Sequence, residues 1–251
     1  IKGIWMAAFH SVSAFCNAGF DILGTAENKY PSLTGYIGNP AINITIMLLI
    51  IVGGIGFLTW EDIYTNKWHF KKYRMQSKVI LVTTAILIIA PAVFFFFCDF
   101  TGLPLAERIL ASLFQSVTPR TAGFNTADLP AMTGSSKAIM TMLMLVGGSP
   151  GSTAGGMKTT TLAVLILSAF SVCRKKDDAE VCGRRIDGSA VKNAAAVAVM
   201  YFLLFFVGGI VISTAEGLPL STCLYETASA VGTVGLTLGI TPQLGVLSQL
   251  I

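Results

Sequence analysis

Charged residues are scarce in this sequence of 251 residues. Aspartate, glutamate, lysine and arginine together make up 12% of it, whereas an ordinary soluble domain carries about 25%. Hydrophobic residues make up 53%, and the mean hydropathy is +0.72. The composition therefore argues against an ordinary soluble domain and favours a chain that lies in a membrane.

Residues that carry enzyme chemistry or bind metals are also few. The two histidines are His10 and His69, and no pair of carboxylates falls within the apolar blocks described below. A membrane-embedded enzyme would need such a cluster on its spanning helices, so we expect no enzyme activity. The five cysteines fit no zinc pattern, and we interpret all of them as small hydrophobic residues. They are Cys16, Cys98, Cys173, Cys182 and Cys223.

Long apolar blocks account for the high hydropathy. They cover residues 42–58, 79–98, 139–173 and 194–214, and the third is broken in its middle. A helix of roughly 20 apolar residues spans a bilayer core. A single block could be a buried helix of a soluble protein, but all of them together predict a multi-pass membrane protein of the cell (inner) membrane.

Basic residues gather in two connections between these blocks. The first connection holds Lys67, Lys71, Lys72, Arg74 and Lys78, and the second holds Arg174, Lys175, Lys176, Arg184, Arg185 and Lys192. The positive-inside rule places both in the cytoplasm. It also puts His10 and His69 on opposite sides of the membrane. Topology accounts for the net charge of +4, so we expect no nucleic-acid partner, although the basic connections could contact anionic lipid or an acidic protein.

A short string with one glycine recurs three times. The copies are Asn17-Ala18-Gly19-Phe20, Thr121-Ala122-Gly123-Phe124 and Thr233-Val234-Gly235-Leu236, named here the first, second and third glycine strings. Glycine reaches backbone conformations closed to other residues, so its carbonyl can be aimed at a ligand. Such turns in an apolar chain suggest rings of carbonyls that replace the water shell of a cation.

Each glycine string follows a segment that predicts a short helix, at residues 4–15, 105–118 and 219–230. Phe9, Phe114 and Tyr225 occupy matching places in these segments, and His10, Gln115 and Glu226 follow them. The segments are too short to span a bilayer. We expect re-entrant pore helices, because irregular backbone at membrane depth must lie within protein or line a watery cavity. The repeating unit is an outer helix, a pore helix, a glycine string and an inner helix around a pseudosymmetric pore.

The break in the third apolar block is rich in glycine. Five glycines and a proline between Gly147 and Gly156 cannot continue a stable helix, and their backbone must meet polar groups or water. The segment is not a phosphate-binding Walker loop, because Met157 separates Gly156 from Lys158. A static kink is the plain interpretation, and a gate is the functional one.

These motifs resemble a known family, the superfamily of potassium transporters that includes TrkH and KtrB, with KtrB the more similar. The resemblance lies in residues 9–20, residues 118–125 and the run 147–158, and it covers essentially the whole chain. The family places four repeats around one pore. The resemblance therefore implies an all-α membrane protein with a pseudo-fourfold pore, of which this chain lacks the first repeat and the last inner helix. We expect the native polypeptide to continue at both ends.

The resemblance also assigns the segments and their roles. Residues 1–60 would form the second repeat, 79–173 the third with its broken inner helix, and 194–251 the fourth, with cytoplasmic loops at 61–78 and 174–193. The potassium filter would comprise Asn17, Ala18, Gly19, Thr121, Ala122, Gly123, Thr233, Val234 and Gly235. Asn17, Thr121 and Thr233 would add side-chain oxygens to the carbonyl ligands. The gate would comprise Gly147, Gly148, Ser149, Pro150, Gly151, Ser152, Thr153, Ala154, Gly155, Gly156 and Lys158.

Charged residues near the filter and gate are the remaining candidates. Arg120 would support the filter by bonding carbonyls or by pairing with Glu226 of the next pore helix, and the alternative role is direct repulsion of ions. Lys158 would either extend to the cytoplasmic side or hold the gate closed by bonding loop carbonyls. Asp21, just outside the first glycine string, is either a solvated aspartate or a residue that attracts cations.

The predicted function is potassium uptake through a central pore, and the alternative is a sodium-coupled or sodium-permeable transporter. A homotetrameric channel with one repeat per subunit is a further class, which the three different strings in one chain argue against. The resemblance implies no cofactor, with potassium as the transported ion, and a dimer in the lipid bilayer. It also implies a cytosolic ring of nucleotide-binding regulators as partner.

Overall fold

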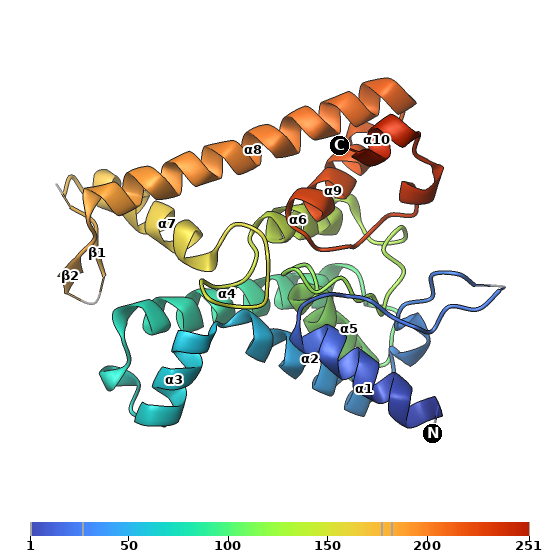
Figure 1. Ribbon diagram of the computed structural model, residues 1–251, viewed down its shortest axis with the longest axis horizontal. Helices are drawn as coiled ribbons and strands as arrows, with labels where there is room; N and C mark the ends of the chain where they lie inside the picture. Colours follow the sequence, from blue (N-terminus) through green and yellow to red (C-terminus); the bar gives the residue numbers. More distant parts are fainter. Residues whose placement is uncertain (1, 27, 177, 182, 251) are drawn as a thin grey trace.

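The computed structural model describes residues 2–26, 28–176, 178–181 and 183–250, so Cys182 lies outside the described residues. The chain is mostly helical (Figure 1). Its α-helices are α1 (Lys2–Phe15), α2 (Pro40–Gly54), α3 (Phe57–Asn66), α4 (Met75–Cys98), α5 (Leu105–Val117), α6 (Gly134–Leu145), α7 (Thr159–Cys173), α8 (Gly188–Glu216), α9 (Leu220–Val231) and α10 (Val246–Leu250). Short 3-10 helices are η1 (Thr34–Tyr36), η2 (Phe70–Lys72) and η3 (Thr241–Gln243), and β1 (Glu180–Val181) pairs antiparallel with β2 (Arg184–Arg185).

Two of the predicted apolar blocks form long helices. Among the described residues, α4 and α8 are each long and apolar enough to cross a bilayer, with mean hydropathies of 2.7 and 2.6. They contain the predicted segments 79–98 and 194–214 and extend beyond them. Gly217, with φ +66°, follows α8 in the left-handed conformation that glycine adopts freely. The expectation of long apolar helices at these two places is confirmed.

The other two blocks are interrupted. Block 42–58 was expected to be one helix, and this is wrong, because α2 and α3 meet at an angle of 100°. Gly56 makes the bend possible, since its φ is +88° and a Cβ there would collide with the carbonyl oxygen of Pro150. Block 139–173 is broken as expected, into α6 and α7 with the glycine-rich segment between them.

The three short helices match their predicted segments within two residues at each end. α5 and α9 begin after Pro104 and Pro219, which occupy the residue before each helix. α1, α5 and α9 all end where a glycine string approaches, because a residue with positive φ cannot continue a right-handed helix. The sequence therefore places the strings at equivalent points of three similar helix–turn units.

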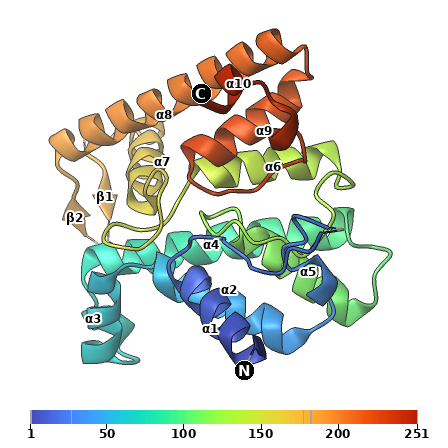
Figure 2. The same ribbon diagram turned by 45° about the vertical axis from the view of Figure 1, so that its right-hand side comes forward.

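Helix packing repeats along the chain. α4 packs against α5 as α8 packs against α9, which pairs a long helix with the short helix that follows it. α2 packs against α5 as α6 packs against α9, which pairs a helix after one glycine string with the short helix before the next. Figures 1 and 2 show the consequence: α1, α2 and α5 lie on one side of α4, and α6, α7, α8 and α9 lie on the other.

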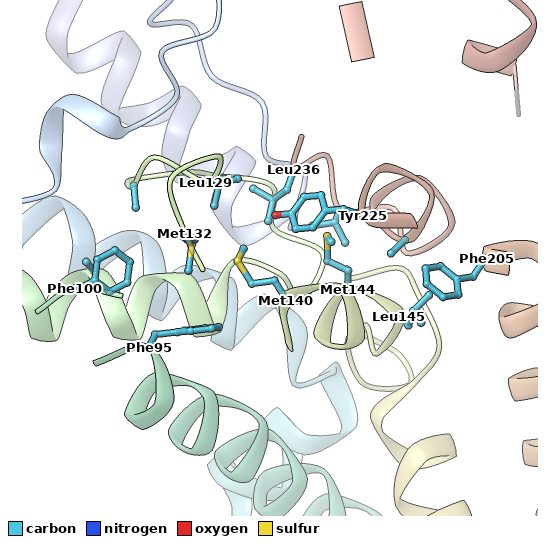
Figure 3. Packing of buried hydrophobic residues seen from close by; sticks show 14 residues of the cluster. Phe95, Phe100, Leu129, Met132, Met140, Met144, Leu145, Phe205, Tyr225 and Leu236 are labelled. Carbon is cyan, nitrogen blue, oxygen red and sulfur yellow. The ribbon is translucent and has the colours of Figure 1, made fainter. Parts of the chain in front are cut away.

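The main core lies beside the third glycine string. Figure 3 shows Phe95 of α4, Met140 and Met144 of α6, and Phe205 of α8 among its buried side chains. Tyr225 of α9 joins them. Leu236, the last residue of the third string, is only 3% exposed in the same cluster. The buried side chain of Leu236 therefore anchors the third string, and the backbone of the string faces away from this core.

Apolar residues also cover much of the outer surface. Large hydrophobic side chains are exposed along α2, α4 and α8; examples are Leu48, Val52, Ile86, Phe97, Leu203 and Val207. An exposed apolar surface this extensive is unusual for a soluble monomer and fits contact with lipid. Both basic connections, one through α3 and one through β1 and β2, lie at the same end of the molecule in Figures 1 and 2. That placement agrees with the prediction that they share one side of the membrane.

Candidate functional site

The fold brings the three glycine strings together. A Cβ on Gly19 would collide with the carbonyl oxygen of Ala122, and a Cβ on Gly123 would collide with that of Val234. A Cβ on Gly235 would lie 4.0 Å from the Cα of Gly123. The strings therefore lie side by side in chain order, and the first two glycines sit where no side chain fits.

All three strings share one backbone conformation. The first residue and the glycine of each string have positive φ, while the residue between them does not: Asn17 (51°), Gly19 (72°), Thr121 (65°), Gly123 (77°), Thr233 (57°) and Gly235 (88°). A positive φ is uncommon for non-glycine residues, and β-branched threonine adopts it at a cost of about 1–3 kcal/mol. When left-handed and right-handed backbone conformations alternate along a chain, consecutive carbonyl groups point to the same side of it. Three copies of a strained conformation at one place indicate a shared role for those carbonyls.

Each string is tied to the helix before it. The amide of Ala18 donates to the carbonyl of Ser13 (2.9 Å), and the amide of Val234 donates to that of Ser229 (2.8 Å). In the second string the amide of Ala122 donates to the carbonyl of Thr118 (3.0 Å). These bonds fix the strings against the C-terminal turns of α1, α5 and α9, where the helix dipole places partial negative charge.

Hydroxyl groups bond the second half of each glycine string. The residues that carry them were not among the sequence candidates. Ser13 Oγ donates to the carbonyl of Phe20 (2.8 Å) and Thr118 Oγ1 donates to that of Phe124. Ser229 Oγ accepts from the amide of Gly235 (3.1 Å). The signal was available, because each hydroxyl lies four positions after the matched aromatic residue of its helix.

The segment after each string repeats a second motif. Asp21 Oδ1, Asn125 Oδ1 and Thr237 Oγ1 each accept the amide two residues ahead, at 3.0, 3.1 and 2.9 Å. These residues lie two positions after Gly19, Gly123 and Gly235. Asp21 therefore has a local structural role. It also lines an open depression beside the first string, together with Phe20, Lys29 and Tyr30.

Polar residues on the short helices brace these turns. Gln115 Nε2 donates to Asn125 Oδ1 at 3.0 Å. The Glu226 carboxylate accepts from Thr237 Oγ1 and the Leu238 amide, both at 2.8 Å, and from Thr241 Oγ1 at 2.7 Å.

His10 occupies the matching place on α1 but does not brace its turn. Its Nδ1 lies 2.7 Å from the Met6 carbonyl oxygen. Its Nε2 is buried without a partner among the described residues. His10 is therefore a hydrogen-bonded residue of α1.

Arg120 is buried beside the second string, but its pairing with Glu226 does not occur. Its exposed fraction is 6%, and its Nη2 donates to Thr84 Oγ1 of α4 at 3.4 Å. The Glu226 oxygens are already taken up by the loop that follows the third string. That contact fixes Arg120 to a long helix one residue before Thr121.

The side chains at the head of the strings differ from one another. Asn17 Oδ1 accepts from Thr153 Oγ1 (3.0 Å), and Thr233 Oγ1 donates to the carbonyl of Gly232 (2.7 Å). Thr121 Oγ1 is buried without a partner in the described part of the chain. An oxygen ligand from these side chains therefore stays a prediction, and Thr121 offers the freest one.

Backbone hydrogen bonds hold together the two ends of the glycine-rich loop, residues 147–156. Val146 and Met157 form an isolated parallel bridge, the amide of Gly147 donates to the Met157 carbonyl (2.8 Å), and the amide of Gly148 donates to that of Gly155 (3.3 Å). A Cβ on Gly147 would collide with the carbonyl oxygen of Gly155. The glycines are thus required for the crossing of two chain segments.

The loop is seated on the end of α2. The amides of Ser149 and Thr153 donate to the carbonyls of Gly54 (2.9 Å) and Gly53 (3.3 Å), and the amide of Phe57 donates to that of Gly151 (3.0 Å). These bonds satisfy backbone groups that the broken helix cannot pair internally.

The loop also contacts two of the three strings. Thr153 Oγ1 lies 3.0 Å from both Asn17 Oδ1 and the Phe15 carbonyl oxygen. A Cβ on Gly155 would collide with Thr233 Oγ1. The loop therefore lies against the base of the first and third strings.

Lys158 closes the loop from its C-terminal side. Its Nζ donates to the carbonyls of Ala154 (2.6 Å) and Gly155 (3.5 Å). Of the two alternatives for this residue, the geometry agrees with the bonding of loop carbonyls. Ser149 Oγ and Thr159 Oγ1, 3.0 Å apart, add a second link between the loop and the start of α7.

Comparison with known proteins decides the family. The model of the TrkH family, described as cation transport protein, matches residues 1–251. The chain belongs to the TrkH family. It is therefore a member of a family of cation transporters, not of enzymes, and the resemblance to this superfamily is confirmed.

Individual relatives agree with the family model. The chain is 40% identical over 259 aligned positions to the potassium/sodium uptake protein NtpJ of Enterococcus hirae, covering 100% of this chain and 56% of that protein. It is 35% identical to the Ktr system potassium uptake protein B of Bacillus subtilis, covering 97% and 54%. The chain thus spans about half the length of these TrkH-family relatives.

A solved structure shows the same fold. The potassium transporter TrkH from Vibrio parahaemolyticus superimposes with a TM-score of 0.73 at 20% identity, over 92% of this chain and 49% of that chain. The likeness confirms the helical fold. The roles of individual residues rest on the geometry given above.

Proposed function

We propose that this chain forms three walls of a potassium-conducting pore. Residues 1–60, 79–173 and 194–251 are three repeats, and residues 61–78 and 174–193 are their cytoplasmic connections. The observation that carries the proposal is the shared strained backbone of the three adjacent strings, with positive φ at Asn17, Thr121 and Thr233.

The carbonyls of the glycine strings are the proposed ligands. Rings of backbone carbonyls replace the hydration shell of potassium, and the alternating backbone turns the carbonyls of one string to one side. The C-terminal ends of α1, α5 and α9 add partial negative charge at the same place. The ion then needs no carboxylate in the strings, and none is present there. Arg120 and Glu226 support this filter by fixing the backbone on either side of it.

The glycine-rich loop is the proposed gate. Residues 147–156 with Lys158 lie against the base of two strings, where they obstruct the path of an ion leaving the filter. Lys158 holds the loop in its closed form through the carbonyls of Ala154 and Gly155. Hydrogen bonds to α2 and to Asn17 couple the position of the loop to the first string.

A sodium-coupled or sodium-permeable transporter is the second candidate. The relative with 40% identity is itself named for both potassium and sodium uptake. Each string carries only one glycine, and a filter this loose would admit sodium as well as potassium. We also propose assembly as a homodimer in the inner membrane with a cytosolic nucleotide-binding ring.

Ion uptake by the full-length protein tests the proposal. The protein is reconstituted into vesicles with an imposed membrane potential, and uptake of rubidium or potassium is followed with and without sodium. We expect saturable potassium uptake driven by the potential. Uptake that requires sodium in the same compartment would favour the second candidate, and absence of any cation flux in folded protein would contradict both.

A further inference from the structure

The segment between α2 and α4 carries an unusual exposed surface. Trp68 is 97% exposed and Tyr64 87% exposed, with Phe70 and Ile63 exposed nearby. Lys67, Lys71 and Lys72 are also exposed. α3, η2 and the turn between them carry these residues and extend away from the helices around the glycine strings (Figures 1 and 2). We name residues 57–74 the elbow.

The acidic residues of the elbow do not offset this positive charge. Asp62 is buried, where its carboxylate accepts from the Arg74 amide (3.0 Å) and from Ser77 Oγ. Glu61 pairs with Arg74 Nη2 at 2.9 Å. Both carboxylates are thus engaged by Arg74, while no ion pair forms at Lys67, Lys71 or Lys72 within the described residues.

Hydrogen bonds preform the elbow at the end of a spanning helix. Trp60 Nε1 donates to the Val52 carbonyl (2.8 Å) across the 100° bend, and Tyr73 Oη donates to that of Lys67. α4 begins at Met75, directly after the elbow. The aromatic and basic side chains are therefore held beside the point where α4 would enter the bilayer.

We propose that the elbow binds the headgroups of anionic phospholipids in the cytoplasmic leaflet. Tryptophan and tyrosine favour the headgroup level of a bilayer, because one part of each ring is apolar and another is polar. Lysines clustered next to a spanning helix attract anionic lipids. An indole that would be fully exposed to water gains apolar contacts there. The proposal rests on the proposed orientation of the chain in the membrane, with the elbow on the cytoplasmic side. It does not depend on the role of the glycine strings.

The other basic connection provides the contrast. Residues 174–193 contain no phenylalanine, tryptophan or tyrosine, and Arg185 is paired with Asp178 at 2.9 Å. Charge alone would make both connections equal in lipid binding. The elbow combines charge with exposed aromatic side chains, so it should be the stronger site.

Native mass spectrometry of the full-length protein tests the proposal with matched variants. The triple variant Lys67→Gln, Lys71→Gln, Lys72→Gln is compared with Arg174→Gln, Lys175→Gln, Lys176→Gln, which removes the same charge from the other connection. Phosphatidylglycerol and phosphatidylcholine are titrated into each protein. We expect the elbow variant to lose at least about tenfold in phosphatidylglycerol affinity and the control to lose much less, because each lysine at an anionic surface contributes separately.

A second measurement reports on Trp68 itself. The emission of Trp68 is obtained as the difference between wild-type protein and Trp68→Phe in nanodiscs that contain brominated phosphatidylglycerol. Quenched, blue-shifted emission is expected. Emission of a water-exposed indole, or equal loss of lipid affinity in the two triple variants, would overturn the proposal and leave an acidic protein as the occupant. Ion uptake is unaffected by either outcome, so failure here is separate from failure of the proposed function.

Discussion

Hydroxyl groups at one matched place fasten all three glycine strings, and their contribution can be isolated at Thr118. Thr118→Val keeps the shape of the side chain but leaves the Phe124 carbonyl without its donor, at a cost of about 1–3 kcal/mol. We expect folded protein with a lower ratio of potassium to sodium flux. Thr118→Ser retains the hydroxyl and should behave like the wild type. Equal selectivity in the valine and serine variants would remove Thr118 from the filter support.

At the scale of residues, sequence patterns located the strings but not their partners. The glycines of the strings could be picked out because few residues tolerate positive φ. The roles of Ser13 and Ser229 were missed, since a serine near a helix end has many possible acceptors. The choice between partners for Arg120 also could not be made, because it depends on which helix lies across from it. Thr84, on α4, provides that contact.

At the scale of elements, the glycine-rich loop is held by a small number of bonds. Thr153 Oγ1 lies within 3.1 Å of the Phe15 and Gly53 carbonyls and of Asn17 Oδ1. Thr153→Val removes these contacts, so we expect the loop to open more often and cation flux to rise. Thr153→Ser keeps the hydroxyl and serves as the control. Flux of the valine variant at the wild-type level would show that this side chain does not restrain the loop.

Deletion of the loop is the stronger form of the same test. Removing residues 148–155 takes out the segment that lies against the first and third strings, so flux should exceed that of Thr153→Val. The deleted protein must first be shown to be folded, by its elution as a single species and by its helical content. Unchanged flux in such protein would identify the segment as a static kink.

The helices themselves were largely predictable, and the exceptions have physical causes. The apolar runs of α4 and α8 and the proline-led starts of α5 and α9 were visible in the sequence. The bend between α2 and α3 was not, because both halves are apolar near the junction. The chain bends at Gly56, where a Cβ would collide with the carbonyl oxygen of Pro150. That contact exists only when the glycine-rich loop packs against the end of α2.

At the scale of the whole molecule, the two basic connections should lie on one side of the membrane. Lys71→Cys and Lys175→Cys are introduced separately into protein without its native cysteines, with Gly102→Cys in the connection between α4 and α5 as the opposite-side control. In intact cells an impermeant maleimide should label only Gly102→Cys. The other two should react after permeabilisation. Labelling of Lys71→Cys and Lys175→Cys from opposite sides would contradict the proposed topology.

The arrangement of repeats follows from packing that no single segment reveals. α5 and α9 each contact both the long helix before them and the helix after the preceding string, so adjacent units share a wall. The sequence predicted the units through their matched aromatic residues. It could not predict that the strings approach closely enough to exclude a Cβ at Gly19 and Gly123, because that distance is set by tertiary packing, around Ala14 and Phe124 in one core and around Tyr225 and Met144 in another.

The selectivity of Gly123→Ser tests the central claim most directly. Serine at φ +77° is strained, and its Cβ would collide with the Val234 carbonyl oxygen, so two strings must move apart. Gly102→Ser is the control, because nothing lies within 4 Å of a Cβ there. The potassium-to-sodium flux ratio is measured in vesicles for the full-length protein and both variants. We predict a ratio that falls toward one in Gly123→Ser and stays at the wild-type value in Gly102→Ser; an unchanged ratio in folded Gly123→Ser would contradict the assignment of the glycine strings as the filter.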